Sequence, residues 1–419
     1  MPARPAGPEN TMNLKHAKLD NGLTVIAEVR DSAASMAAGF FVRTGARDET
    51  PDIAGVSHFL EHMVFKGTDR RDPLEVNREF DSMGANYNAF TSEENTVFYG
   101  AVLPEYQDAL LDLLGDILRP SLRGEDFDLE KNVILDEIAR YRDMPRYRVY
   151  ETLLAEYFRP HPLGHSVLGS TESVGALTRE QMLAYFERRY AANNLTLVGV
   201  GNVDFDALVA KASQMCGHWP WAEAGRDLAE PAGQCGQKIV TDPNVMRQQI
   251  ALASPAPTSQ NGDRYAAMLA TTLLGDTTGS RLYYALVDPA LTDEASMVYD
   301  SLDGAGAFLT FMSCDGEKAS QVVEIARREM AEFQANGPTE AEMQAAKNKI
   351  ASGATLKGEV PMGRLTAVAY DWVYRGEYVP LAEQIETLFA VTGEQVVDVA
   401  RKYDLDRTML VALGPLEKL

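Results

Sequence analysis

Cysteine is scarce in this chain of 419 residues. Cys216, Cys235 and Cys314 are the only three, and they lie far apart in the sequence. They form no C-x-x-C pair, so the sequence indicates neither a disulfide framework nor a cysteine-based zinc site. Such sparing use of cysteine is typical of a reducing compartment, and we expect a cytoplasmic protein.

Long apolar runs are also missing. No window approaches eighteen consecutive apolar residues, so we expect no membrane span. Residues 1–13 hold three prolines and no apolar core of the kind that secretory signals carry. We therefore expect this segment to be a disordered leader, with folded structure starting at Leu14.

Basic residues are in deficit. The chain has 39 Lys and Arg against 61 Asp and Glu, which gives a formal net charge of −22. A surface this acidic repels phosphate backbones, so we expect no nucleic-acid partner. The charge either serves solubility alone or attracts basic peptides at low salt.

The length favours more than one domain, because 419 residues exceed one ordinary hydrophobic core. Residues 217–237 are rich in Gly, Pro, Ala and Trp and show no clear period, as expected of a linker. We therefore predict an N-terminal domain over residues 14–216 and a C-terminal domain over residues 238–419. Two similar segments, residues 178–201 and 392–414, each read as a Thr-x-Glu-Gln helix start followed by a strand closing on glycine, which indicates two copies of one α/β unit.

Local patterns place the elements of the first domain. Residues 14–29 are typical of a hairpin around Asp20-Asn21-Gly22. Residues 55–67 are typical of a helix, with Ser57 as a possible N-cap and Gly67 as a possible stop. Further helices are expected over residues 110–118 and 127–141, and strand-like alternation follows Gly84.

The sequence His58-Phe-Leu-Glu61-His62 carries the chemistry. On a helix, His58 and His62 lie one turn apart on the same face, where two imidazoles can bind one metal ion. Glu61 can point towards the same site without being a ligand. This order, H-x-x-E-H, is the inverzincin signature.

Two histidines need a carboxylate to complete a catalytic zinc site of the His₂Glu type. The helix predicted over residues 127–141 carries Glu130 and Glu137, which are seven residues apart and share one face. Such a pair suits one ligand and one carboxylate that orients a histidine. On spacing alone, Glu130 and Asp136 compete with Glu137 for the role of ligand.

Several stretches resemble the pitrilysin/insulinase family of zinc metallopeptidases, and most closely its short members, which are similar to the mitochondrial processing peptidase β subunit. They are GVSHFLEHMVFKGT, LDNGLTVIAEV, GANYNAFTS, EKNVILDEI and HPLGHSVLGS. The resemblance covers residues 14–225 and, more weakly, the rest. It implies an α+β fold of two homologous domains, each a mainly antiparallel sheet with packed helices.

The resemblance also implies a role for each site residue. His58, His62 and Glu137 would be ligands of Zn²⁺, with Glu130 the supporting carboxylate. Glu61 would be the general base that takes a proton from the zinc-bound water. An edge strand would pair with an extended peptide substrate; its residues would be Asn88, Ala89, Phe90 and Thr91.

The second domain departs from the family pattern. Val287 stands where active members carry an arginine, and the expected tyrosine falls near Asp293 to Ala295, where there is none. Tyr299 is the nearest tyrosine, and Arg264 or Arg281 is a possible substitute for the arginine. A homodimer, or a heterodimer with a related chain that supplies both groups, would restore them.

These observations predict a zinc metalloendopeptidase that hydrolyses peptides or unfolded segments, either alone or together with a partner subunit. The alternative is a non-catalytic subunit of a larger complex, like the core proteins of respiratory complexes in this family. The altered second domain favours that alternative, whereas the intact Glu61 argues against it.

Overall fold

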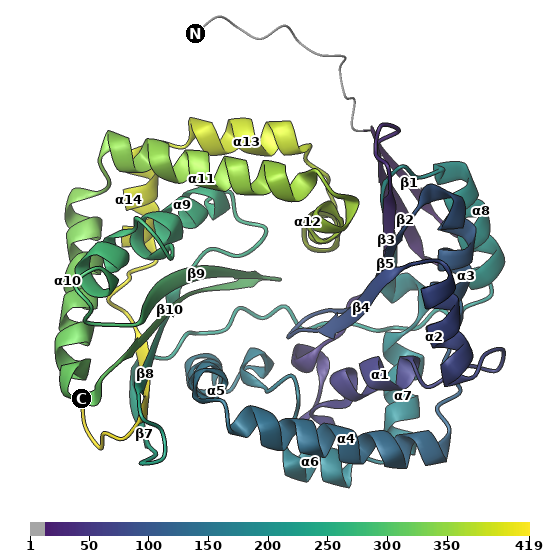
Figure 1. The fold of residues 1–419 in the computed structure, drawn as a ribbon, viewed down its shortest axis with the longest axis horizontal. Helices are drawn as coiled ribbons and strands as arrows, with labels where there is room; N and C mark the ends of the chain where they lie inside the picture. The colour runs from purple at the N-terminus through teal and green to yellow at the C-terminus, as the bar shows by residue number, and fades with distance from the viewer. Residues whose placement is uncertain (1–12) are drawn as a thin grey trace, which may run out of the picture. The chain divides into compact units, whose positions relative to one another are not determined.

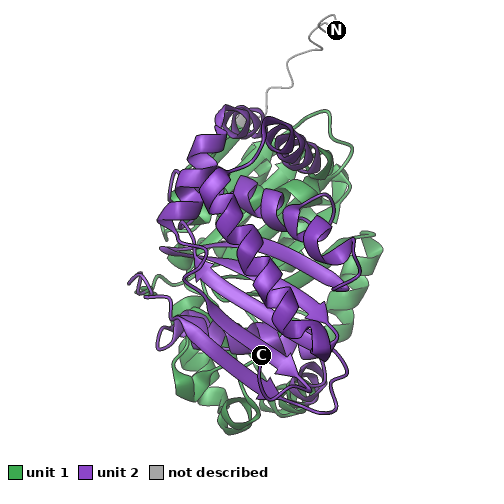
Figure 2. Ribbon diagram, turned by 90° about the vertical axis from the view of Figure 1, so that its left-hand side faces the viewer, with its two compact units in different colours: residues 1–135, 167–226, 355–380 green, residues 136–166, 227–354, 381–419 purple. Residues whose placement is uncertain are grey.

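The computed structural model describes residues 13–419, and the expected leader lies, but for Asn13, outside the described residues. The chain forms two compact units (Figure 2). Unit 1 contains residues 1–135, 167–226 and 355–380, and unit 2 contains residues 136–166, 227–354 and 381–419. Neither unit is continuous in sequence.

Unit 1 is built on a six-stranded sheet with the order β1-β2-β6-β3-β5-β4. β2 and β6 are parallel, and every other neighbouring pair is antiparallel. The strands are β1 (Asn13–Lys18), β2 (Thr24–Val29), β3 (Met36–Val42), β4 (Asn86–Thr91), β5 (Thr96–Val102) and β6 (Leu195–Gly201). The predicted hairpin is confirmed as β1 and β2, with Gly22 in the left-handed conformation (φ 93°) that its turn requires.

Helices cover this sheet (Figure 1). All seven residues of β3 are buried, because α3 and α12 both contact this central strand. The helices of unit 1 are α1 (Val56–Val64), α2 (Pro73–Ser82), α3 (Gln107–Ile117), α6 (Thr171–Ala176), α7 (Arg179–Arg189), α8 (Phe205–Cys216) and α12 (Pro361–Arg375). The helix α4 (Gly124–Arg142) begins in unit 1 and runs unbroken past residue 135.

Unit 2 is built on a five-stranded sheet with the order β7-β11-β8-β10-β9. Its strands are β7 (Gly236–Thr241), β8 (Gln248–Pro255), β9 (Glu294–Leu302), β10 (Ala305–Cys314) and β11 (Met409–Gly414). Its helices are α5 (Pro145–Phe158), α9 (Arg264–Gly275), α10 (Ala319–Asn336), α11 (Glu340–Gly358, whose last turn falls in unit 1), α13 (Leu381–Ala390) and α14 (Gly393–Lys402).

The two units repeat one topology. β6 lies between a parallel neighbour, β2, and an antiparallel one, β3, and β11 lies in the same way between β7 and β8. The helices before them, α7 and α14, start with the same capping box, from Thr178 to Gln181 and from Thr392 to Gln395. The predicted two-domain α+β fold with mainly antiparallel sheets is confirmed.

The compact units differ from the contiguous ranges 14–216 and 238–419 that the sequence led us to expect. Each half of the chain gives one helix to the other half's sheet: α5 belongs to unit 2 and α12 to unit 1. In unit 1, Leu365 and Val368 of α12 pack in one cluster with Phe41 of β3. An apolar helix face does not specify which sheet it will cover, so sequence pattern alone could not assign these helices.

The expected linker, residues 217–237, has neither helix nor strand from residue 219 to residue 235. Part of it belongs to unit 1, where Arg189 Nη1 donates to the carbonyls of Ala224 and Gly225. Within residues 13–419, no helix combines the length and the apolar character needed to cross a membrane.

Candidate metal centre

The helix α1 carries the H-x-x-E-H sequence, and it starts at a glycine. Gly55 is the N-cap, with φ 93°, and Ser57 lies inside the first turn, so the expectation that Ser57 caps the helix is wrong. The carboxylate of Glu49 replaces a local cap: it accepts the N–H groups of Gly55 and Ser57, both at 2.7 Å. The helix ends at Val64, and Gly67 adopts a left-handed conformation (φ 97°) three residues later.

Packing holds α1 against α4, which runs beside it in Figure 1. The apolar side of α1 is buried, and the ring of Phe59 stacks on Phe127 of α4 with centroids 4.8 Å apart. Because the apolar face is turned inward, His58, Glu61 and His62 share the remaining face. This orientation directs the polar face of α1 towards the later turns of α4.

The structure brings His58, His62 and Glu137 together. One ligand atom of each lies within 4.8 Å of the others, and the two imidazole centroids are 4.8 Å apart. Glu137 lies two turns after Glu130 on the unbroken helix α4, so the helix itself sets its position. Asp136, the competing carboxylate, is exposed and is not part of this group.

Glu130 lies behind His62 rather than in the group of three. Its Oε2 is 3.1 Å from His62 Nδ1, and its Oε1 is 2.6 Å from Lys66 Nζ. A carboxylate that accepts the Nδ1 proton selects Nε2 of His62 as the ligand atom. The structure therefore places Glu130 where a supporting carboxylate acts, and Lys66 is a neighbour that the sequence analysis did not identify.

The donor set fits a zinc ion: two imidazole nitrogens and a carboxylate leave one tetrahedral position open. Burial, and after it the proximity of His62, lowers the pKa of His58 to about 3. His58 is therefore neutral at physiological pH, as a metal ligand must be.

Glu61 is hydrogen-bonded to a residue of strand β4. Thr91 Oγ1 donates to Glu61 Oε2 at 2.7 Å, and Thr91 is the last residue of β4. This hydrogen bond selects one orientation of the carboxylate. Thr91, expected only as a residue of the substrate-binding strand, therefore also contacts Glu61.

The four residues expected to contact substrate lie in β4, which is confirmed as an edge strand of the sheet. Asn88 is exposed, and its Oδ1 accepts the N–H of Ala89, whose own side chain is buried. β4 pairs with β5 only, so its other edge is open for pairing within the described sheet.

In unit 2, the candidate substitutes for the family's arginine and tyrosine are held in other contacts. Val287 ends the short helix Tyr283–Val287 and packs against the core. Tyr299 donates from its hydroxyl to the carbonyl of Pro257 at 2.8 Å. Arg281 is paired with Glu342 at 3.0 Å, and Arg264 lies over the ring of Tyr265.

Buried polar groups that the sequence analysis missed lie beneath the start of α1. Glu49 is 3% exposed, and burial raises its pKa to about 7. The hydroxyl of Tyr185 lies 2.9 Å from Ser57 Oγ and 2.7 Å from Thr44 Oγ1. Glu49 follows the short 3-10 helix Ala46–Asp48 and belongs to no periodic pattern, so only the folded structure shows that it is buried.

Comparisons with known proteins agree with this arrangement. Residues 24–171 match the profile "Insulinase (Peptidase family M16)", and residues 176–350 match "Peptidase M16 inactive domain". A relative from Mycobacterium tuberculosis, named as an uncharacterized zinc protease, is 30% identical over 99% of this chain and 96% of its own.

Solved structures share the fold. A protease from Helicobacter pylori has a TM-score of 0.89 at 20% identity, covering 96% of this chain and 100% of its own. A chain of complex III2 from Candida albicans has a TM-score of 0.83 at 17% identity, covering 97% of each chain.

Proposed function

The chain belongs to the insulinase family, peptidase family M16, and on this premise we propose that it is a zinc-dependent endopeptidase acting on peptides or unfolded segments. The observation that carries the proposal is the group formed by His58, His62 and Glu137, with Glu61 on the same helix as the two histidines. A purely structural helix has no need of this combination.

The residues of the site have three separate roles: holding the metal, orienting a ligand and transferring a proton. His58, His62 and Glu137 would hold the zinc ion, which when bound supplies a Lewis acid that lowers the pKa of water and polarises the scissile carbonyl. Glu130 orients His62 through Nδ1. Glu61 takes the proton of the attacking water and later gives it to the leaving amine.

Thr91 orients this general base. Its hydroxyl donates to Oε2 of Glu61 and so restricts the rotation of the carboxylate that receives the water proton. The open edge of β4 pairs with an extended peptide and brings it beside the end of the strand, where Thr91 lies. Recognition through backbone hydrogen bonds tolerates varied side chains, which suits unfolded substrates.

A partner chain would supply the arginine and the tyrosine that the family pattern places in unit 2. Val287 replaces the family's arginine, and Tyr299 and Arg281 are bound to neighbours inside unit 2. Loss of an oxyanion donor lowers a rate by ~10²–10³-fold. A second copy, or a related chain that carries the arginine and tyrosine, would complete the site.

The test is cleavage of a mixed peptide library by the purified chain with zinc, followed by mass spectrometry, with Glu61→Gln as the matched inactive variant. Cleavage by the wild type and none by Glu61→Gln supports a self-sufficient peptidase. Zinc binding without cleavage, and cleavage once a related chain with the arginine and tyrosine is added, supports the two-chain enzyme.

A non-catalytic structural subunit is the second candidate, and Val287 is the observation that favours it. Zinc binding with no cleavage in the presence of such a related chain would support this candidate. No zinc binding and no cleavage would overturn the peptidase proposal.

A further inference from the structure

We propose that Glu49 is a positioning residue of the metal centre: its buried carboxylate holds the first turn of α1 and thereby fixes His58 relative to the other ligands. The inference rests on the proposed zinc site. It concerns a residue outside the H-x-x-E-H sequence and outside α4, nine positions before His58 in the chain.

The geometry requires both carboxylate oxygens. Glu49 Oε2 accepts the N–H of Gly55, and Oε1 accepts the N–H of Ser57, each at 2.7 Å. Gly55 has no side chain with which to cap the helix, so Glu49 satisfies donors that the helix cannot satisfy itself. Two bonds to two backbone N–H groups of the first turn fix the start of α1, and His58 follows Ser57 directly.

Glu49 is an unusual choice for stability alone. Its side chain is buried, and its partners are N–H and O–H donors of α1. Burial raises the pKa of Glu49 more than these hydrogen bonds lower it, and the nearby carboxylate of Asp48 raises it further. A carboxyl group in this buried position, with both oxygens turned towards the start of α1, points to a role in positioning that helix.

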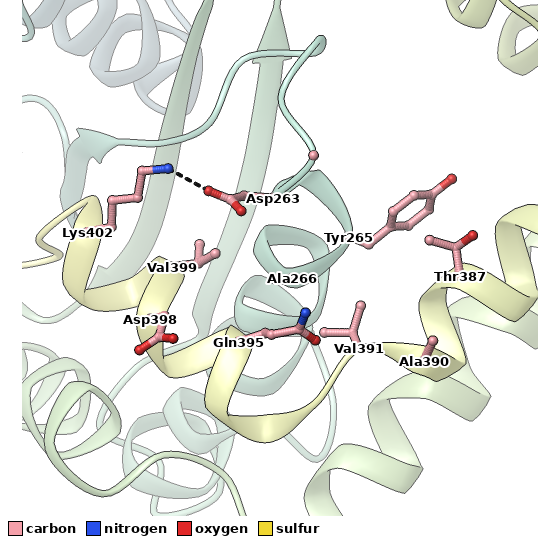
Figure 3. A pocket seen from close by; sticks show the side chains of 11 residues that line it. Asp263, Tyr265, Ala266, Thr387, Ala390, Val391, Gln395, Asp398, Val399 and Lys402 are labelled. Carbon is pink, nitrogen blue, oxygen red and sulfur yellow. Dashed lines mark hydrogen bonds and ion pairs between the residues drawn. The ribbon is translucent and has the colours of Figure 1, made fainter.

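Unit 2 offers an internal comparison. The helix α9 follows β8 and precedes β9, as α1 follows β3 and precedes β4, and it carries no histidine. Its N-cap, Asp263, makes no capping hydrogen bond and instead pairs with Lys402 at 2.7 Å beside a cavity of about 390 Å³ (Figure 3). Of the two corresponding helices, α1 carries the histidines and has the buried carboxylate of Glu49 at its start, whereas α9 has neither.

The isosteric substitution Glu49→Gln tests the proposal. An amide accepts through one oxygen only and turns an N–H₂ group towards the second donor, so α1 loses one of its two anchors. We expect the variant to fold, to bind zinc ~10–100-fold more weakly in competition with a chelator, and to give an altered visible spectrum with Co²⁺. In a cleavage assay kcat should fall while KM stays unchanged.

A matched control separates positioning from general destabilisation. Leu208 is fully buried in α8, which packs on α3 and β2 rather than on α1. Leu208→Ala should lower the melting temperature and leave both zinc affinity and the Co²⁺ spectrum unchanged. Should Glu49→Gln fail to fold, Glu49→Asp, whose shorter side chain cannot reach both N–H groups, takes its place with the same expected result.

Wild-type zinc affinity and an unchanged Co²⁺ spectrum in the Glu49 variant would overturn this proposal and leave the zinc site standing. A wild-type chain that binds neither zinc nor Co²⁺ would instead overturn the proposed function, and this inference with it.

Discussion

Replacing Glu130 by glutamine should weaken zinc binding without removing a ligand. Glu130 is 3% exposed, and its two oxygens divide between His62 Nδ1 at 3.1 Å and Lys66 Nζ at 2.6 Å. The amide can accept from only one of them, and it leaves the Lys66 ammonium next to His62 without its neutralising charge. Both effects disfavour a cation at the ligand group.

The expected magnitude follows from measured losses of such supporting carboxylates, which are ~10–100-fold in metal affinity, or about 1.4 to 2.8 kcal/mol. The assay is competition between the protein and a chromophoric zinc chelator at fixed pH. Glu125→Gln is the matched control, because it removes the same charge from an exposed position in the first turn of the same helix. If Glu130→Gln and Glu125→Gln both bind zinc like the wild type, Glu130 does not support His62 and the reasoning is refuted.

Three further predictions follow from single contacts. Thr91→Val should lower kcat about 10- to 100-fold with KM unchanged, because a hydrogen bond to a charged group contributes about 1.5–3 kcal/mol. Thr91→Ser keeps the hydroxyl and should keep most of the activity. Equal activity of the two variants would contradict the positioning of Glu61 by Thr91. Glu28→Gln should lower the free energy of unfolding by about 3 kcal/mol in urea titrations, because it leaves the buried Arg364 without its counter-charge at 2.9 Å. Asp263→Asn, which breaks an exposed pair, should change the free energy of unfolding by less than about 1 kcal/mol. Burial raises the pKa of Glu49 from 4.5 to about 7, so the contribution of Glu49 to stability is complete below about pH 4.5 and is lost as the pH rises through about 7. The free energy of unfolding of metal-free Glu49→Gln, relative to that of the wild type, should therefore rise by about 3 kcal/mol from pH 4.5 to pH 8. A difference that does not change with pH would show that Glu49 titrates normally.

Local spacing predicted much of the candidate site. Two histidines four residues apart must share a helix face, and the structure places their rings 4.8 Å apart. Spacing could not choose among Glu130, Asp136 and Glu137, because all three lie on one predicted helix. The packing of α4 on α1, for example of Phe127 on Phe59, makes the choice: the rotation of α4 excludes Asp136, and its position along α1 brings Glu137 to the two histidines and Glu130 to Nδ1 of His62.

Other features could not be predicted from local pattern. The cap of α1 comes from Glu49, a loop residue outside the helix, so the rule that favours a serine near the helix start led to Ser57. The exchange of α5 and α12 between the units depends on which sheet each apolar face meets, and that is a property of the tertiary fold. Both cases involve contacts between residues whose partners no periodicity identifies.

The most direct test of the account is anomalous X-ray diffraction at the zinc edge from crystals grown with zinc. The account predicts one strong peak per chain, within about 2.0–2.2 Å of a nitrogen of His58, a nitrogen of His62 and a carboxylate oxygen of Glu137. It also predicts that Glu130 stays bonded to His62 Nδ1 and does not contact the ion. No peak at this group, or a peak bound by Glu130 or Asp136 in place of Glu137, would contradict it.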